Sequence, residues 1–178
     1  MPTAILIPSD TDSEQGWSSS NIHSVLDDQT NTATQNNINC DWTGDMTDLD
    51  GSLSGETINS VKLTLKAQRG AKGNATVDVK LIDGPSGNTV INQTLTYDDA
   101  SSEQTLETSA ATTQHDGSTA LTFSYLNACK LAIDPDGTGI TVNQLFATVD
   151  YGAAVVIAPN IVTLSSGNIT INNGTITL

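Results

Sequence analysis

Basic side chains are scarce in this chain of 178 residues. It has 6 lysines and arginines against 20 aspartates and glutamates, so its formal net charge is −14. A surface of this charge repels phosphate groups and anionic lipids. We therefore expect no nucleic acid and no membrane among the partners of the protein.

Long apolar runs and cysteines are scarce as well. No stretch approaches the roughly 20 apolar residues of a membrane span, and the first residues lack the basic start and long apolar core of a secretory leader. We expect a protein that is made in a reducing cytosol. Cys40 and Cys129 are then expected to be buried thiols, although the sequence leaves a disulfide between them open.

The motifs of familiar catalytic sites are missing. The sequence contains no Gly-x-Ser-x-Gly elbow, no His-Glu-x-x-His helix and no phosphate-binding glycine loop. We interpret the two histidines, His23 and His115, as surface residues, and we expect neither enzyme activity nor a cofactor. A catalytic set assembled from distant positions stays open.

Aspartates gather next to glycines in two short stretches. Calcium binds such oxygen ligands in loops, but neither stretch has the spacing of the Asp-x-Asp-x-Asp-Gly loop with its distant glutamate. Aspartate and glycine are also common in turns, so we predict turns and no metal site. The two groups are Asp41, Asp45, Asp48 and Asp50, and Asp134 with Asp136.

Residues 57–152 alternate between apolar and polar side chains, as strands with one buried face do. Val61, Leu63 and Leu65 fall on one face of a first strand, and the same pattern recurs in 77–81 and 89–97. A weaker segment surrounds Leu106. Several short strands separated by glycine and proline turns are typical of a β-sandwich.

Two further elements are expected in this region. We predict a short helical turn over 122–127. The segments 130–134 and 140–151 are expected to form a closing hairpin around the turn sequence Pro135-Asp136-Gly137.

The last 26 residues, 153–178, have no charged side chain and contain three heptads that begin at Ala158, Ser165 and Asn172. Each heptad has Asn or Gly third, Val or Ile fifth, Thr sixth, and Leu or Ile seventh, so the fifth and seventh side chains share a strand face. Threonine, asparagine and glycine at the other positions oppose a coiled coil.

This tail is too short to bury its own apolar side chains, because an isolated hairpin is only marginally stable in water. Either it packs on its own sandwich, or it associates with other copies or another surface. We favour association, because an exposed apolar strand invites strand pairing. The candidate assembly residues are Ile161, Val162, Leu164, Ile169, Ile171, Ile176 and Leu178.

Five of the six basic residues lie between positions 62 and 80, where we place them on the outer faces or in the turn of one hairpin. Charges there can prevent edge pairing. Alternatively, they form a docking patch for an acidic partner, for example another copy of this chain. The residues are Lys62, Lys66, Arg69, Lys72 and Lys80.

Aromatic side chains make up only 4% of the chain. Sugar-binding sites usually stack the sugar ring on an aromatic platform. Phe123 and Tyr125 share strand parity and are the candidates for a small platform. Phe146, between Leu145 and Ala147, is predicted to be a core residue.

The segments 58–67, 77–81, 123–133 and 142–151, together with Trp17 and the stretch Asp45-Met46-Thr47-Asp48-Leu49, resemble the jelly-roll β-sandwich modules of tailed-phage virion proteins. Head decoration proteins and fibres are the nearest types, and the resemblance covers more than half of the chain. It implies an all-β, antiparallel jelly-roll sandwich over 1–152, with a turn-rich part in 1–55 and the main strands in 57–152, followed by the β tail 153–178. It transfers no catalytic residue.

The function that this resemblance implies is structural and non-enzymatic. We expect a capsid decoration (cement) protein on the surface of a bacteriophage virion, a homotrimer that bridges capsomers of the major capsid protein and is made in the host cytoplasm. The alternatives are a tail-fibre or receptor-binding module for cell-surface glycan, or a carbohydrate-binding module.

Overall fold

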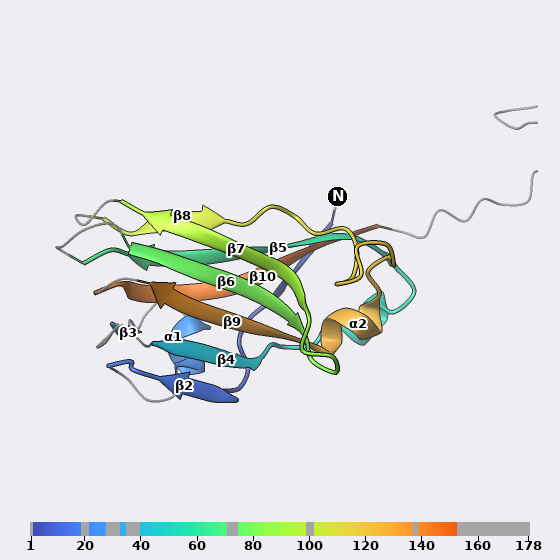
Figure 1. The fold of residues 1–178 in the computed structure, drawn as a ribbon. Coiled ribbons are helices and arrows are strands. Elements are labelled where there is room, and N and C mark those ends of the chain that lie inside the picture. Colours follow the sequence, from blue (N-terminus) through green and yellow to red (C-terminus); the bar gives the residue numbers. More distant parts are fainter. Residues whose placement is uncertain are drawn as a thin grey trace, which may run out of the picture.

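Two antiparallel sheets face each other in the part of the chain that the structure describes (Figure 1). The computed structural model describes residues 2–18, 22–27, 33–34, 40–70, 75–98, 102–136 and 139–152. Sheet 1 contains β1 (Thr3–Leu6), β3 (Ala33–Thr34), β5 (Thr57–Gln68), β8 (Gln104–Glu107) and β10 (Thr141–Gly152). Sheet 2 contains β2 (Ser13–Gln15), β4 (Asp41–Asp45), β6 (Ala75–Asp83), β7 (Thr89–Tyr97) and β9 (Cys129–Asp136). The helical turns are α1 (His23–Leu26), η1 (Gly51–Leu53) and α2 (Phe123–Asn127).

The strands pair in a nested order along the chain. The innermost pair is β6 with β7, and outside it β5 pairs with β8, β4 with β9, and β1 with β10. Alternate pairs fall in opposite sheets, so that sheet 1 has the order β1-β10-β5-β8 and sheet 2 has the order β2-β4-β9-β6-β7. In the described residues, successive nested pairs therefore alternate between the two sheets, with the core between them.

The core lies between the sheets and follows the predicted alternation. Val61, Leu63 and Leu65 of β5 have no exposed surface, and neither do Val77 and Val79 of β6. Burying a side chain of this size stabilises a fold by about 1.5–3 kcal/mol. The all-β prediction and the inward face of these two strands are confirmed.

The predicted closing hairpin is wrong. β9 pairs with β4 and β6 in sheet 2, whereas β10 pairs with β1, β3 and β5 in sheet 1. Pro135 is not in a turn but in β9, opposite Val77. Proline is tolerated there because the β4 pairing stops at Ile133, so the missing N–H of Pro135 is not needed on that side.

The predicted helical turn at 122–127 is confirmed as α2. Its N-cap is Thr122, whose side-chain oxygen accepts a hydrogen bond from the backbone N–H of Tyr125 at 3.2 Å. The helix lies at the end of the sandwich where β6 turns into β7 (Figure 1). A backbone hydrogen bond of 3.1 Å from Gly84 to the carbonyl of Ala128 fixes this turn against the residue that follows the helix.

The N-terminal part contributes strands to both sheets and large side chains to the core. Trp42 of β4 is fully buried, and its Nε1 donates to Thr11 Oγ1 at 3.1 Å. Trp17 is buried as well and donates from Nε1 to the carbonyl of Asp41 at 2.8 Å. Helix α1 packs against β10.

The tail 153–178 lies outside the described residues, so its predicted β structure stays a prediction.

Candidate functional site

The surface feature that best suits binding of a partner is the free edge of sheet 2. Its outermost strand, β7, has nine residues, while the edge strands β1, β2 and β8 have four, three and four. Proteins usually protect such an edge with charged side chains, with proline or by making it short. The sequence of β7, TVINQTLTY, contains neither a charged residue nor a proline.

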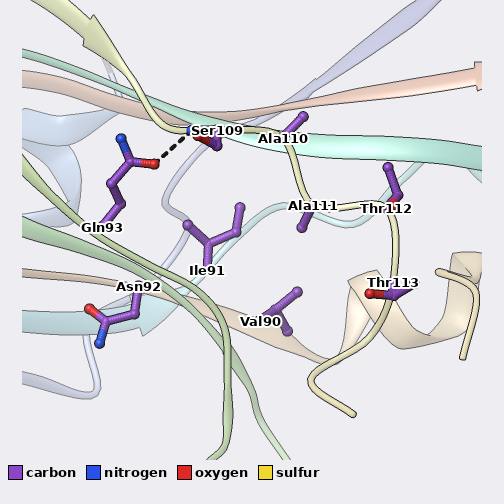
Figure 2. A pocket seen from close by; sticks show the side chains of 9 residues that line it. All are labelled: Val90, Ile91, Asn92, Gln93, Ser109, Ala110, Ala111, Thr112 and Thr113. Atoms are coloured by element: carbon purple, nitrogen blue, oxygen red, sulfur yellow. Dashed lines mark hydrogen bonds between the residues drawn. The ribbon is translucent and has the colours of Figure 1, made fainter. Parts of the chain in front are cut away.

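A groove runs along this edge (Figure 2). One wall consists of residues 90–93 of β7 and the other of residues 109–113, and the space between them is about 360 Å³. Figure 2 shows the bridge between the walls, a 2.7 Å hydrogen bond from the backbone N–H of Ser109 to Gln93 Oε1. No charged side chain lines the groove. Its full lining is Val90, Ile91, Asn92, Gln93, Ser109, Ala110, Ala111, Thr112 and Thr113.

The second wall is fixed to sheet 1. Ala111 and Val61 exchange two backbone hydrogen bonds of 2.8 and 2.9 Å, and the N–H of Thr108 donates to the carbonyl of Leu63 at 2.9 Å. The groove thus lies between the edge of one sheet and the edge of the other. Backbone groups and small uncharged side chains of this kind suit an extended, uncharged peptide better than a phosphate or a charged ligand.

A polar cluster lies at the α2 end of the sandwich, and sequence reasoning missed it. Asp83, at the end of β6, is 6% exposed. His115 Nδ1 lies 3.3 Å from Asp83 Oδ2 and 3.1 Å from Tyr125 Oη. Ser86 Oγ donates to the same Asp83 oxygen at 2.5 Å. The cluster ties the loop around His115 to the β6–β7 turn and to α2.

The interpretation of the histidines as surface residues is confirmed for His115, which is exposed, and needs correction for His23. The side chain of His115 is 30% exposed, and its ring stacks on Tyr125 with the centroids 6.4 Å apart. His23 is half-buried and its Nδ1 lies 2.9 Å from Thr11 Oγ1. No local signal could have found the cluster, because its members are separated by as much as 42 residues.

Cys129 lies next to this cluster and is held in its protonated form. Its thiol donates to the carbonyl of Tyr125 at 3.3 Å. Burial, assisted by the charge of Asp83, raises the pKa of Cys129 to about 12. A thiol with this pKa is not a nucleophile near neutral pH. The cluster can thus hold loops together, but the thiol beside it is not activated.

Both cysteines are buried and neither forms a disulfide, which confirms the expected buried thiols. Cys40 Sγ donates to the carbonyl of Gly16 at 2.7 Å.

Among the described residues, the structure places the candidate docking residues Lys62 and Lys66 on one sheet and Lys80 on the other. β5 and β6 are not a hairpin, as the sequence suggested, but belong to different sheets. Lys62 and Lys66 therefore lie on the outer face of sheet 1, and Lys80 lies on the outer face of sheet 2. Lys62 Nζ forms an ion pair with Glu107 at 2.7 Å, and Lys80 Nζ forms one with Asp134 at 3.4 Å.

Arg69 follows β5, and Lys72 lies outside the described residues. A docking role for the five residues stays a prediction, although Lys62 and Lys66 lie on a different sheet from Lys80.

The aspartate stretches are only partly turns. Asp50 caps η1, where its carboxylate accepts from the N–H of Ser52 at 2.8 Å, and this backbone hydrogen bond lowers its pKa. Asp41 and Asp45, however, bound β4, and Asp134 and Asp136 lie in β9, so the turn prediction is wrong for these four. Among the described residues, no three His, Cys, Asp or Glu side chains come close enough to hold a metal ion.

The aromatic predictions fail at three positions. Phe123 and Tyr125 belong to α2 rather than to a strand, so they do not form the expected platform. Phe146 is only half-buried, because Leu145 and Ala147 point into the core and Phe146 therefore faces outward from sheet 1, opposite Thr64.

The candidate assembly residues of the tail, Ile161 to Leu178, all lie outside the described residues. In the part of the chain that is described, no helix is both long and apolar enough to cross a membrane. A scan against protein-family models finds no match for the chain, and neither does a search of curated proteins.

Proposed function

We propose that this chain is a non-enzymatic structural protein of a tailed-phage virion, built on a jelly roll. The observation that carries the proposal is the nested strand order. A jelly roll consists of eight strands in two sheets. The eight strands β1, β4 and β5 to β10 pair first with last and so on inward, as wrapping one antiparallel ribbon requires, and β2 and β3 are additions at the edges.

The strand order alone does not select the function, because capsid proteins, lectins and cupins all use jelly rolls. Composition and the tail favour the virion role. The formal charge of −14 argues against nucleic-acid binding, and the three uncharged heptads suit association with other chains. A glycan reader has less support, because Phe123 and Tyr125 lie in α2 and the Tyr125 hydroxyl is engaged with His115.

Within the virion, the proposed role is that of a capsid decoration, or cement, protein on the capsid surface. A homotrimer would contact several copies of the major capsid protein at once. Its mechanism is mechanical, because linked contacts that are individually modest add up through their high effective concentration. The tail, with Ile161, Ile169 and Ile176 among its apolar residues, would mediate association between copies or with the capsid.

Two measurements test this proposal. Light scattering after size exclusion should give the full chain a mass of three copies of 18.5 kDa, and a chain ending at Tyr151 should be a monomer. Mass spectrometry of purified virions of the encoding phage should then detect the chain in the capsid fraction. A full-length monomer that is absent from virions would contradict the proposal.

A further inference from the structure

The edge of β7 and the groove beside it have the properties of a docking site for one more strand. β7 is the longest edge strand of the described residues and has no charged side chain and no proline. Edge strands with these properties are the ones that pair with a strand from another chain. We propose that a heptad of the tail 153–178 from a second copy of this chain adds to the edge of β7. This inference rests on the proposed function and names the contact that holds its copies together.

The groove flanks four residues of β7, 90–93, and can hold the backbone of a short added segment there. Neighbouring strands lie about 4.8 Å apart, so the incoming backbone must fit between β7 and the wall 109–113. That wall presents Ser109, Ala110 and Ala111, whose side chains are among the smallest, and the space holds about 360 Å³. The walls contain no charge that the incoming strand would have to desolvate.

Among the described residues, one side-chain hydrogen bond spans the groove and has to give way. Gln93 Oε1 accepts from the N–H of Ser109 across the groove, as Figure 2 shows. The side chain of Gln93 can rotate away without moving the backbone of β7. A carbonyl of the incoming strand can then accept from the same N–H of Ser109, so this donor keeps a partner.

Charge and pattern select the tail as the occupant. In a molecule with a net charge of −14, an acidic segment of another copy would be repelled, whereas 153–178 is the longest stretch of the chain without a charged side chain. Each heptad contains an Ile-Thr-Ile or similar unit, whose first and third side chains would share one face of an added strand. β7 has nine residues, so a segment of seven fits within its length.

The proposed trimer requires that the docked tail come from a second copy of the chain. A tail docked on its own sandwich would pair with the edge of β7 but would not join one copy to another. The two arrangements bury the same surface but differ in which chains are connected. A disulfide between copies distinguishes them directly.

The first experiment places charges in the groove of the full chain. The double variant Asn92→Glu with Ala110→Glu changes two exposed lining residues. Its control, Ser13→Glu with Gln15→Glu, adds the same two charges to exposed positions of β2, the opposite edge of the same sheet. We expect light scattering to show loss of the trimer in the groove variant and an intact trimer in the control. A trimer that survives in both variants would overturn the inference but leave the proposed function standing.

The second experiment identifies the occupant. A tagged copy with Asn92→Cys is co-expressed with an untagged copy with Ser166→Cys, and the oxidised product is analysed on a non-reducing gel. We expect a disulfide between tagged and untagged chains, and none when Gln15→Cys replaces Asn92→Cys. A chain that carries both cysteines and forms only an internal disulfide would overturn the second copy as occupant, and so would the absence of any mixed disulfide. A full-length wild-type monomer would contradict both the inference and the proposed function.

Discussion

Tyr97 connects the two sheets through a single buried hydroxyl group. The ring belongs to the last residue of β7 and is fully buried, and its Oη donates to the carbonyl of Leu65 in β5 at 2.9 Å. Burial is also the main cause that raises the pKa of Tyr97 above its usual value. The hydrogen bond thus fixes the end of the free edge strand to the opposite sheet.

We expect Tyr97→Phe to lower the free energy of unfolding by about 1–2 kcal/mol, because the carbonyl of Leu65 loses its donor in a buried site. Urea unfolding followed by tryptophan fluorescence measures the change. Tyr151→Phe, at a half-buried tyrosine of β10, is the control and should change stability much less. Equal changes in the free energy of unfolding of the two variants would contradict a stabilising role of the Tyr97 hydroxyl.

Cys129 makes the stability of the fold depend on pH in the alkaline range. Its thiol has a pKa of about 12 in the folded protein, whereas a thiol in an unfolded chain ionises near pH 8.5. Above that value the unfolded state releases a proton that the folded state keeps, so stability is present in full below about pH 8.5 and falls as the pH rises toward 12.

The resulting prediction is a decline in the free energy of unfolding of about 1.4 kcal/mol per pH unit from this group. Urea titrations between pH 8 and pH 11 measure it. The variant Cys129→Ala should be less stable at pH 7 but should show a shallower decline, and a decline as steep as that of the wild type would contradict the assignment.

At the scale of elements, the sequence predicts where strands lie but not which strands pair with each other. The alternation in β5, β6 and β7 was predictable, because a strand with one buried face must alternate apolar and polar side chains. The same alternation is present in β9 and β10, yet they lie in different sheets. Period two determines which side of a strand is buried and says nothing about its neighbour.

The candidate site could not be predicted for the same reason, because its position depends on which strands pair. The segment 89–97 is visible as a strand in the sequence, but its place at the edge of sheet 2 follows only from the pairing of β6 with β9. The Asp83–His115 contact depends on the turn and the loop that the strand pairing brings together at one end of the sandwich. Both features are consequences of topology, which local sequence does not encode.

Gly84, in the β6–β7 turn, lies in close contact with the residue that follows α2. A Cβ atom added to it would lie 2.2 Å from the carbonyl oxygen of Ala128, which is backbone and cannot rotate away. We expect Gly84→Ala to lower the free energy of unfolding by about 1–3 kcal/mol, because the β6–β7 turn must move from its contact with the residue after α2. Gly55→Ala, where the added Cβ meets open space, is the control for thermal unfolding. Similar midpoints for the two variants would contradict the close contact.

For the whole molecule, the net charge of −14 decides how assembly responds to salt. If uncharged strands hold the copies together, the like charges of the copies oppose association, and salt screens that repulsion. If instead Lys62 and Lys66 dock on the acidic surface of a neighbour, salt screens an attraction. The two interfaces therefore predict opposite signs for the same measurement.

We expect the association of the full chain to become tighter as sodium chloride is raised from 50 to 500 mM, measured by sedimentation velocity over a range of protein concentrations. The double variant Lys62→Glu with Lys66→Glu should still assemble at physiological salt, with a dissociation constant raised only by the added negative charge. Weaker association in high salt, together with loss of assembly in this variant, would move the interface from the β7 edge to the outer face of sheet 1. The sign of the salt dependence thus separates an assembly built on backbone pairing from one built on ion pairs.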